Sequence, residues 1–500
     1  MSNPSPDVPA MDCDLLVVGG GINGVGIARD AVGRGYRVIL VERDDLASHT
    51  SSASTKLIHG GLRYLEHYEF TLVRKALAER EVLLAAAPHI TWPLRFVLPH
   101  EPHLRPAWLI RAGLFLYDHL ARRKRLPASR SINLAEHVAG APLRQTHRRG
   151  FIYSDMWVDD ARLVVLNALD AHERGARILT RTPCQEIRRE GDYWIATLTG
   201  RHAGTVRARA IVNAAGPWAD RFLATASPIR PRHSVRLVKG SHIIVPRLFE
   251  HEYAYIFQNA DRRIVFAIPY EHDFTLIGTT DIEYHGDPAS VAIDRQETDY
   301  LCRLASDYFN RSVTPADVVA AYSGVRPLLE DESSDPSAVT RDYTLDLNTE
   351  GAPLLSVFGG KITTYRRLAE QAMFVLGNAL DQPGTSWTAE VPLPGGDIPD
   401  GNASTYRRQL HARFPTLPPR FIDRIVRSYG TRAERWLGDG SEAALGTEIV
   451  PGLFEAELRY LVSQEWALTA EDILRRRSKL GLHLPPDAEQ IVDNWIAHHT

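Results

Sequence analysis

The sequence predicts an α/β protein in which a doubly wound domain carries an inserted antiparallel sheet and is followed by a helical domain. Three observations indicate this fold class. A strand, a glycine turn, a helix and a second strand follow one another between residues 12 and 42. The hydrophobic pattern then takes the period of strands between residues 231 and 281, and that of helices beyond residue 401. The 500 residues are enough for several domains, each with its own core.

Residues 12–18 form an apolar, β-branched strand, and the glycines after it fit the pattern G-x-G-x-x-G. In a dinucleotide-binding fold Gly19 makes the tight turn, Gly21 lets a pyrophosphate approach the backbone, and Gly24 lets the helix close on the strand. Glu42 ends the second strand, eighteen residues past Gly24, where such folds place the acid that binds a ribose hydroxyl. A glycine-rich turn of some other α/β protein is the alternative, and the agreement of strand, turn, helix and acid disfavours it.

The polar segment after the second strand is rich in hydroxyl side chains, among them Ser51, Ser52 and Ser54. Small hydroxyl groups supply hydrogen bonds without bulk, which suits a loop along a flat cofactor ring; a solvated loop is the alternative. Much later in the chain, Gly359 and Gly360 form a second glycine turn between a predicted strand and a predicted helix. Its backbone N–H groups are suited to bind another part of the same cofactor.

The segment from Ala107 to Arg125 combines an apolar helix, which includes aromatic residues, with a basic flank. Together with Arg105 it holds six Lys or Arg residues and the single acid Asp118. Such a helix can lie on a membrane, with its apolar face in the headgroup boundary and its cations against anionic lipid. A buried helix followed by a solvated basic turn explains the pattern equally well.

Residues 391–401, VPLPGGDIPDG, are rich in proline and glycine and are the predicted linker between two parts of the chain. Beyond them, apolar residues recur at helical spacing, and Thr469 with Asp472 fits a capping box at the start of a helix. We therefore expect a main region at 12–390 and a C-terminal α-helical domain at 402–500.

The composition is that of an ordinary globular protein, with 44% apolar and 24% charged residues. The net charge of -3 gives no global field for nucleic acid, so we expect no nucleic-acid partner.

Cys13, Cys184 and Cys302 are far apart, which disfavours a disulfide framework and a zinc site, and no metal is expected. Residues 1–11 lack the features of a secretory signal and are expected to be a disordered lead-in. No uncharged apolar run reaches the ~20 residues of a membrane-spanning helix.

Seven runs between Ser51 and Glu370 are more specific than the glycine pattern. They are SSASTKLIHGGLRYLEHYEF, YSDMWVDDARL, KGSHIIVP, IGTTD, YSGVRPL, TRDYTLD and VFGGKITTYRRLAE. Together they resemble flavin-dependent glycerol-3-phosphate dehydrogenase, a respiratory enzyme of the D-amino-acid-oxidase-like flavoprotein superfamily. The C-terminal helical domain fits this family too, so the resemblance covers nearly the whole chain. It implies a Rossmann-like FAD-binding domain, built from about 12–100, 150–225 and 340–380, with an inserted antiparallel substrate sheet at about 230–335.

The resemblance implies FAD as the cofactor, whereas the glycine pattern alone leaves NAD open. A second glycine turn far along the chain, without a second dinucleotide fingerprint, favours FAD. The implied pyrophosphate contacts are Gly19, Gly21 and Gly24, and the implied contact of the adenosine ribose is Glu42. The resemblance places Ser51, Ser52 and Ser54 beside the flavin, and Gly359, Gly360 and Lys361 near its pyrimidine end.

The implied reaction is oxidation of sn-glycerol 3-phosphate to dihydroxyacetone phosphate, with electrons passed on to a ubiquinone-type acceptor in the membrane. A glycerol-3-phosphate oxidase that uses O2 is the alternative. A dehydrogenase of this kind is expected in the cytoplasm, attached peripherally to the inner face of the cell membrane through the segment from Ala107 to Arg125. The sequence leaves the oligomeric state open, a homodimer included.

A phosphate dianion needs fixed cations, and arginine suits this role because its planar fork binds phosphate oxygens in pairs. By resemblance the substrate-binding cations are Arg63, Arg326 and Arg341. Tyr64 and Thr279 are expected beside them as hydrogen-bonding groups.

Catalysis needs a base for the C2 hydroxyl proton, and the resemblance leaves His242 and His59 in competition, with His242 favoured by its motif. Lys361 and Arg326 are the expected electrostatic groups of the catalytic set. Each has a structural alternative. Lys361 could cap the carbonyls of the second glycine turn, and Arg326 could form a buried ion pair with an acid among residues 330–332.

Overall fold

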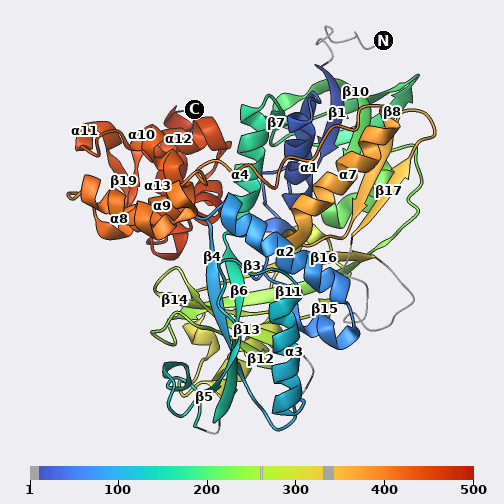
Figure 1. Ribbon diagram of the computed structural model, residues 1–500. Coiled ribbons are helices and arrows are strands. Elements are labelled where there is room, and N and C mark those ends of the chain that lie inside the picture. The colour runs from blue at the N-terminus through green and yellow to red at the C-terminus, as the bar shows by residue number, and fades with distance from the viewer. Residues whose placement is uncertain (1–10, 146, 260, 262, 330–342, 500) are drawn as a thin grey trace.

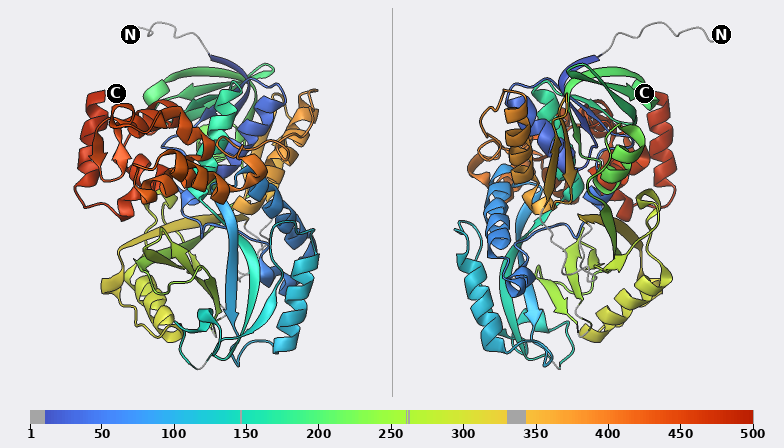
Figure 2. Two further views of the ribbon diagram at one scale, coloured as in Figure 1. Left: turned by 60° about the vertical axis from the view of Figure 1, so that its left-hand side comes forward. Right: turned by 90° about the vertical axis from the view of Figure 1, so that its right-hand side faces the viewer.

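The computed structural model describes residues 11–145, 147–259, 261, 263–329 and 343–499. Two large sheets lie one above the other, and a helical C-terminal domain packs beside them (Figure 1). The two views of Figure 2 place this domain against the side of the upper sheet and its helices. The predicted α/β fold class is confirmed. Most of the expected lead-in and the acids at 330–332 lie outside the described residues.

The upper sheet is the dinucleotide-type sheet that the glycine pattern predicts. An antiparallel hairpin of two strands pairs with one strand of this sheet, in which five strands run parallel and one edge strand is antiparallel to them. Their order across the sheet is β17 (Thr344–Asn348), β18 (Leu354–Phe358), β10 (Gly204–Asn213), β1 (Met11–Val18), β2 (Val38–Val41) and β7 (Arg177–Leu179). This central strand order places the end of β1 and the first glycine turn in the middle of the sheet.

Alternate residues of β1 serve two different cores. Leu15 and Val17 pack against three helices on one face, α1 (Ile22–Gly33), α4 (Asp160–Glu173) and α7 (Tyr365–Ala379). Leu16 and Val18 face the other core, which is covered by β8 (Cys184–Glu190), β9 (Tyr193–Leu198) and α5 (Ala219–Ala226). Burial on both faces explains why the strand reads as a continuous apolar run.

The lower sheet is almost entirely antiparallel. Its order is β15 (Ile282–Glu283), β11 (Val235–Pro246), β14 (Phe274–Gly278), β13 (Ile264–Tyr270), β12 (Ala254–Gln258), β4 (Thr91–Pro99), β6 (Arg149–Val158) and β3 (Leu57–Ile58), while β16 (Ala320–Leu329) pairs with β11 and β5 (Arg130–Asn133) with β6. This sheet is larger than the substrate sheet expected at 230–335. It recruits β3, β4 and β6 from stretches assigned to the FAD-binding parts, because strand pairing between distant segments leaves no local signal.

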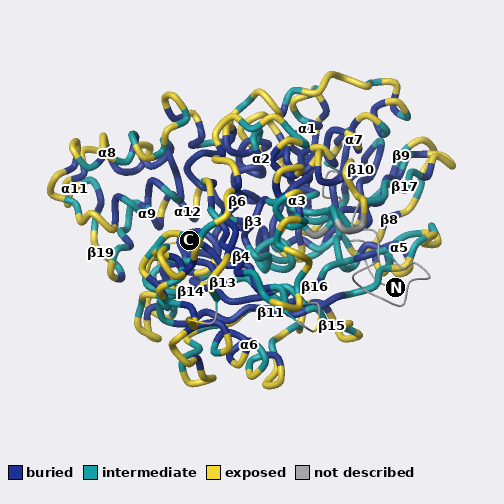
Figure 3. The backbone as a smooth tube through the Cα atoms, turned by 60° about the horizontal axis from the view of Figure 1, so that its bottom comes forward, coloured by how far each residue is buried: buried dark blue, intermediate teal, exposed yellow. Residues whose placement is uncertain are grey.

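Three helices flank the lower sheet: α2 (Phe70–Ala86), α3 (Ala107–His119) and α6 (Arg295–Tyr308). α3 buries Leu114 and Tyr117, while Trp108 and Phe115 on its other face are 72% and 56% exposed. In the burial view of Figure 3 α6 lies at the lower edge of the molecule, and the segments around β3 and β6 near the centre are mostly dark. Within the described residues, no helix is both long enough and apolar enough to span a membrane.

The C-terminal region has a core of its own. It consists of α8 (Ala403–Arg413), α9 (Pro419–Tyr429), α10 (Glu434–Leu437), α11 (Glu442–Leu445), α12 (Glu455–Glu465) and α13 (Ala488–His499), with a short pair of strands, β19 (Glu448–Val450) and β20 (Leu453–Phe454). The predicted capping box is present, because Thr469 and Asp472 each accept a hydrogen bond from the other's backbone N–H. The expected linker packs against the end of α2. Leu393 is buried, and its N–H donates to the Ala86 carbonyl at 2.8 Å.

Candidate functional site

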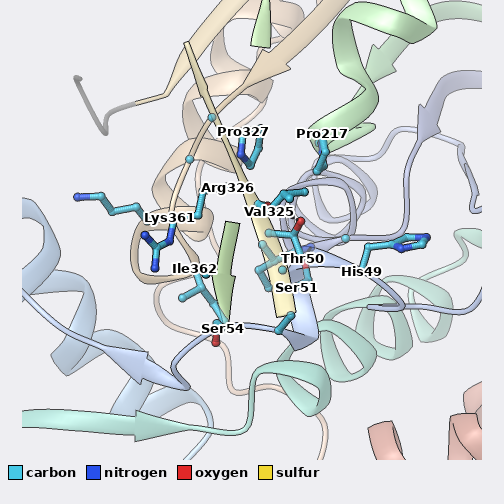
Figure 4. A pocket seen from close by; sticks show the side chains of 18 of the residues that line it. His49, Thr50, Ser51, Ser54, Pro217, Val325, Arg326, Pro327, Lys361 and Ile362 are labelled. Atoms are coloured by element: carbon cyan, nitrogen blue, oxygen red, sulfur yellow. Dashed lines mark hydrogen bonds between the residues drawn. The ribbon is translucent and has the colours of Figure 1, made fainter. Parts of the chain in front are cut away.

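A cavity of about 710 Å³ lies between the two sheets and brings together segments from most of the chain. Both glycine turns line it, as do the hydroxyl-rich loop after β2 and the paired strands β11 and β16. In Figure 4, Arg326 and Lys361 lie on one side of this pocket and His49 on the other. We call the part of the cavity around the glycine turns and Glu42 the cofactor end, and the part around Arg326 and Lys361 the substrate end.

The first glycine turn leaves no room for side chains. Gly19 has φ +114°, and a Cβ on it would lie 2.4 Å from the Ala214 carbonyl oxygen. A Cβ on Gly24 would lie 1.9 Å from the Gly19 carbonyl oxygen, so only glycine lets α1 close on this turn. Gly21 is the N-cap of α1, and its Cβ would lie 3.1 Å from Ser51 Oγ. The three glycines thus form the close-packed cradle that a pyrophosphate needs at a helix N-terminus.

Glu42 fixes this turn from the end of β2. Its carboxylate accepts hydrogen bonds from the N–H groups of Gly20 at 2.6 Å and Asp44 at 2.8 Å. Burial raises the pKa of Glu42, although both N–H donors oppose that shift. Glu42 also lines the cavity, at the end of the second strand, where dinucleotide-binding folds carry an acid.

The second glycine turn is tied to the first. Gly359 and Gly360 have φ values of +73° and +97°, and Asn23 Nδ2 at the start of α1 donates to the Gly359 carbonyl at 3.2 Å. Asn23 Oδ1 is buried without a hydrogen-bond partner among the described residues, and Asn23 lines the cavity. Two adjoining helix N-termini and an unpaired buried acceptor fit a dinucleotide cofactor. Sequence reasoning missed Asn23, whose only signal was a polar residue inside the glycine pattern.

The serines of the loop after β2 have different partners. Ser51 Oγ accepts from the Ile22 N–H at 3.0 Å, at the start of α1. Ser52 Oγ donates to the His49 carbonyl at 3.3 Å, and Ser54 Oγ donates to Asp160 Oδ2 at 2.7 Å. Ser51 and Ser54 line the cavity, as the sequence suggested, yet all three hydroxyls form hydrogen bonds that hold the loop.

Arg326 reaches the cavity from β16. Its Nη1 donates to Asp281 Oδ1 at 2.7 Å, and both side chains are about one-third exposed. A Cβ on Gly240, which pairs with Gly324 across β11 and β16, would lie 2.6 Å from Thr279 Oγ1 and 3.1 Å from Arg326 Nη2. The absence of a side chain at this point therefore opens the sheet for the arginine and the threonine. Asp281 is an ion-pair partner that the sequence reasoning did not name.

Lys361 follows the second glycine turn, and its Nζ lies 4.0 Å from the centre of the Tyr64 ring. Tyr64, His59 and Lys361 all line the cavity, and the His59 N–H donates to Thr363 Oγ1 at 3.4 Å. Such an ammonium over an aromatic face is held by a cation–π interaction. The side chain of Arg63 and the whole of Arg341 lie outside the described residues.

His242 lines the cavity from β11 and is 1% exposed. Its Nε2 lies 3.0 Å from Thr55 Oγ1, and its ring stacks on Tyr322 at 4.7 Å. Burial, reinforced by the positive charges of Lys56 and Arg326, lowers the pKa of His242 well below 6.5. The imidazole is therefore neutral at pH 7 and can accept a proton. Among the described residues no group pairs with its Nδ1.

Two family models match the chain. One, described as FAD dependent oxidoreductase, matches residues 14–366, and one described as the C-terminal domain of alpha-glycerophosphate oxidase matches residues 386–498. The chain belongs to the FAD-dependent oxidoreductase family. FAD is therefore its cofactor, and NAD is excluded as the resident carrier. The glycine cradle and the unpaired Asn23 Oδ1 are the features of this chain that fit FAD.

Several members of the family are similar along their whole length. A glycerol-3-phosphate dehydrogenase of Pseudomonas aeruginosa is 56% identical over 98% of this chain and 96% of its own. A D-erythritol 1-phosphate dehydrogenase of Brucella abortus is 54% identical over 97% of each chain. The crystal structure of a Bacillus halodurans glycerol-3-phosphate dehydrogenase with FAD, 28% identical, superposes with a TM-score of 0.75 and covers 98% of this chain and 90% of that one.

Proposed function

We propose that this enzyme oxidises sn-glycerol 3-phosphate at C2 to dihydroxyacetone phosphate. The observation that carries the proposal is a pair of cations, Arg326 and Lys361, in the same cavity as both glycine turns, in a chain 56% identical to a glycerol-3-phosphate dehydrogenase. Bound FAD supplies a two-electron acceptor for the C2 hydride. The remaining C2 hydroxyl proton goes to a base of the protein, so that a ketone is the product.

The substrate end has the groups that a phosphorylated alcohol needs. Arg326 is the proposed phosphate or oxyanion cation, because it is accessible from the cavity and held in place by Asp281. Lys361 is the second cation, and Tyr64 and Thr279 are the proposed hydrogen-bonding groups. On the resemblance of their motifs, we extend the phosphate site to Arg63 and Arg341.

His242 is our proposed base, and His59 is the competitor. The burial that lowers the pKa of His242 keeps the imidazole in the neutral form that a base requires, and it also lowers the affinity of this imidazole for a proton. Thr55 and Tyr322 fix the orientation of its ring through the hydrogen bond and the stacking described above. A general base must come within about 3 Å of the hydroxyl whose proton it takes, and both His242 and His59 line the cavity.

D-erythritol 1-phosphate is the second candidate substrate, since the Brucella abortus relative that carries its name is 54% identical. Both compounds are polyol phosphates, and the cation set suits either. The experiment is a dye-reduction assay of the purified, FAD-loaded enzyme with each compound over a range of concentrations. We expect a larger kcat/KM for sn-glycerol 3-phosphate. A larger value for D-erythritol 1-phosphate would reassign the substrate, and no dye reduction with either would overturn the proposed reaction.

We further propose that the enzyme attaches to a membrane through α3 and the basic segment after it, on the cytoplasmic face, and passes electrons to a quinone. Trp108 and Phe115 expose aromatic surface on one face of α3, and Arg122, Lys124 and Arg125 lie exposed beyond its end. Apolar area beside cations is the combination that binds anionic lipid surfaces.

The acceptor is tested by mixing the reduced enzyme with a short-chain ubiquinone or with O2. We expect fast reoxidation by the quinone and slow reoxidation by O2. Stoichiometric hydrogen peroxide with each turnover would instead identify an oxidase.

A homodimer is a further proposal, and it is tested by the molar mass of the detergent-free protein in solution.

A further inference from the structure

A short segment of the C-terminal domain, Asp472–Lys479, packs behind the loop that lines the cavity. This cavity loop, residues 43–56, follows β2 and leads to β3. The segment begins with a π-helical turn, Asp472–Arg477. Such turns are rare and often lie at functional sites. The segment reaches the cavity loop at two places.

The first place is Asp45, near the start of the cavity loop. Arg477 donates to both carboxylate oxygens of Asp45, at 2.5 and 2.7 Å, and Arg476 Nε donates to one of them at 2.8 Å. All three residues are buried. A two-pronged arginine–carboxylate pair fixes orientation as well as position. The start of the loop is therefore held directly by the C-terminal domain.

The second place is the end of the cavity loop, and the contact runs through the start of α4. Lys479 Nζ donates to Asp159 Oδ1 at 2.8 Å, and Asp159 is the N-cap of α4. The next residue, Asp160, accepts from Lys56 Nζ at 2.7 Å and from Ser54 Oγ at 2.7 Å. The two neighbouring aspartates thus join a lysine of the C-terminal domain to the part of the loop beside the substrate end.

These charges depend on one another because they are buried. Burial opposes the charge of Lys479, but the carboxylates of Asp159 and Asp160 raise its pKa above the ordinary value. Burial also opposes the charge of Asp159, and Lys479 contributes most to lowering its pKa. Removing Lys479 alone would leave Asp159, whose side chain is 18% exposed, without this cation, next to the residue that anchors Ser54 and Lys56.

The cavity loop in turn carries groups of the site. Ser51 Oγ holds the start of α1, and Thr55 Oγ1 lies 3.0 Å from His242 Nε2. A shift of the loop would move both the cofactor cradle and the proposed base. Displacements of about 1 Å in a reacting constellation can reduce a rate by about a hundredfold.

We propose that Lys479, together with Arg476 and Arg477, positions the cavity loop for catalysis, so that the C-terminal domain helps to build the active site. Lys479 touches neither substrate nor cofactor and acts through Asp159 and Asp160. This inference rests on the proposed reaction, since its catalytic consequence is measured with sn-glycerol 3-phosphate.

The test uses four variants of the full-length holoenzyme. Lys479→Met removes the cation and could impair folding, so Lys479→Met/Asp159→Asn removes both charges and keeps a side chain that can cap α4. Lys479→Arg keeps the charge. Arg420→Gln is the matched control, because Arg420 joins the same domain to Asp273, in the surface turn between β13 and β14, at 3.0 Å and away from the cavity loop. The readouts are kcat per bound flavin, KM, the visible circular dichroism of the flavin, the FAD dissociation constant and Tm.

We expect the double variant to melt near the wild-type temperature while its kcat per bound flavin falls by about tenfold or more. Its flavin dichroism should change and its FAD affinity should weaken, and Lys479→Arg and Arg420→Gln should resemble wild type. A double variant with wild-type kcat and dichroism would overturn the proposal, as would an equal loss in Arg420→Gln. If wild-type enzyme fails to turn over sn-glycerol 3-phosphate, the proposed reaction is wrong. The flavin dichroism and the FAD affinity of the variants then still show whether the C-terminal domain positions the cavity loop.

Discussion

The cofactor end and the substrate end of the cavity differ in whether backbone or side-chain atoms form them. The cofactor end consists mainly of backbone, at a first turn whose glycines leave no space for side chains and at a second turn whose two glycines have positive φ values. The substrate end consists of side chains, which come from β11, β16 and the segments after β3 and β18. Backbone sites depend on local chain geometry, whereas side-chain sites depend on how distant strands pair. Damage to the first should remove the cofactor, and damage to the second should remove turnover and leave the cofactor bound.

The largest effect is expected from Gly24→Ala. The new Cβ would lie 1.9 Å from the Gly19 carbonyl oxygen, so α1 must separate from the turn and the cradle must open. We expect protein that is colourless or fails to accumulate, measured by FAD absorbance per chain. Gly113→Ala is the control, because nothing lies within 4 Å of its Cβ inside α3. That variant should keep its flavin and gain up to about 1 kcal/mol of stability. A normally yellow Gly24→Ala protein would contradict the cradle.

Arg326→Ala should separate the two ends. The change removes a charged donor from the substrate end and touches neither glycine turn, so flavin content should stay at the wild-type level. We expect kcat/KM for sn-glycerol 3-phosphate to fall by about a hundredfold or more. Arg236→Ala is the matched control, since Arg236 pairs with Glu283 at 3.0 Å on the same sheet outside the cavity lining. Full activity in Arg326→Ala would remove this arginine from the site.

The pH dependence of kcat/KM should identify the base. Burial, with Lys56 and Arg326, lowers the pKa of His242 well below 6.5, so this histidine stays neutral until the pH is far lower. Activity should therefore persist as the pH falls through 6.5 and decline only well below it. His242→Gln should lower kcat by about a hundredfold, in the range of a lost general base, with FAD retained. An acid limb that disappears in His59→Gln and persists in His242→Gln would assign the role to His59.

The smallest effect is expected at the membrane surface, away from both ends of the cavity. Replacing Trp108 and Phe115 by serine should weaken binding to vesicles of anionic lipid by about tenfold or more, because exposed apolar area is lost. Turnover with a soluble dye should be unchanged. Phe374→Ser is the control, since Phe374 is 61% exposed on α7, far from α3 in sequence. Equal weakening by Phe374→Ser, or none by the α3 variant, would contradict the proposed attachment.

The same contrast explains how far the sequence could be interpreted. The cofactor end was predictable because Gly19, Gly24 and Glu42 have fixed spacing within one strand–helix–strand unit. Family membership confirms FAD as the cofactor, which the glycine pattern alone could not separate from NAD. Asn23 was missed because its only signal was that of a polar residue inside the glycine pattern.

At the substrate end the sequence indicated candidate residues but not the residues that contact them. Arg326 was recognised through its motif, but Asp281 was not named as its partner, because that contact depends on how β14, β11 and β16 lie side by side. The pairing of β4 and β6 within the lower sheet was not foreseen for the same reason. Nothing in the local pattern of Asp45, Asp159 or Lys479 revealed that the C-terminal domain reaches the cavity loop.

The most direct test of the account is anaerobic mixing of the purified holoenzyme with sn-glycerol 3-phosphate while the flavin absorbance is followed. We predict rapid bleaching to the two-electron reduced form and formation of one dihydroxyacetone phosphate per flavin. Glycerol, inorganic phosphate and glycine, mixed separately, should leave the flavin yellow. An unbleached flavin with sn-glycerol 3-phosphate, in protein that dithionite still reduces, would contradict the account.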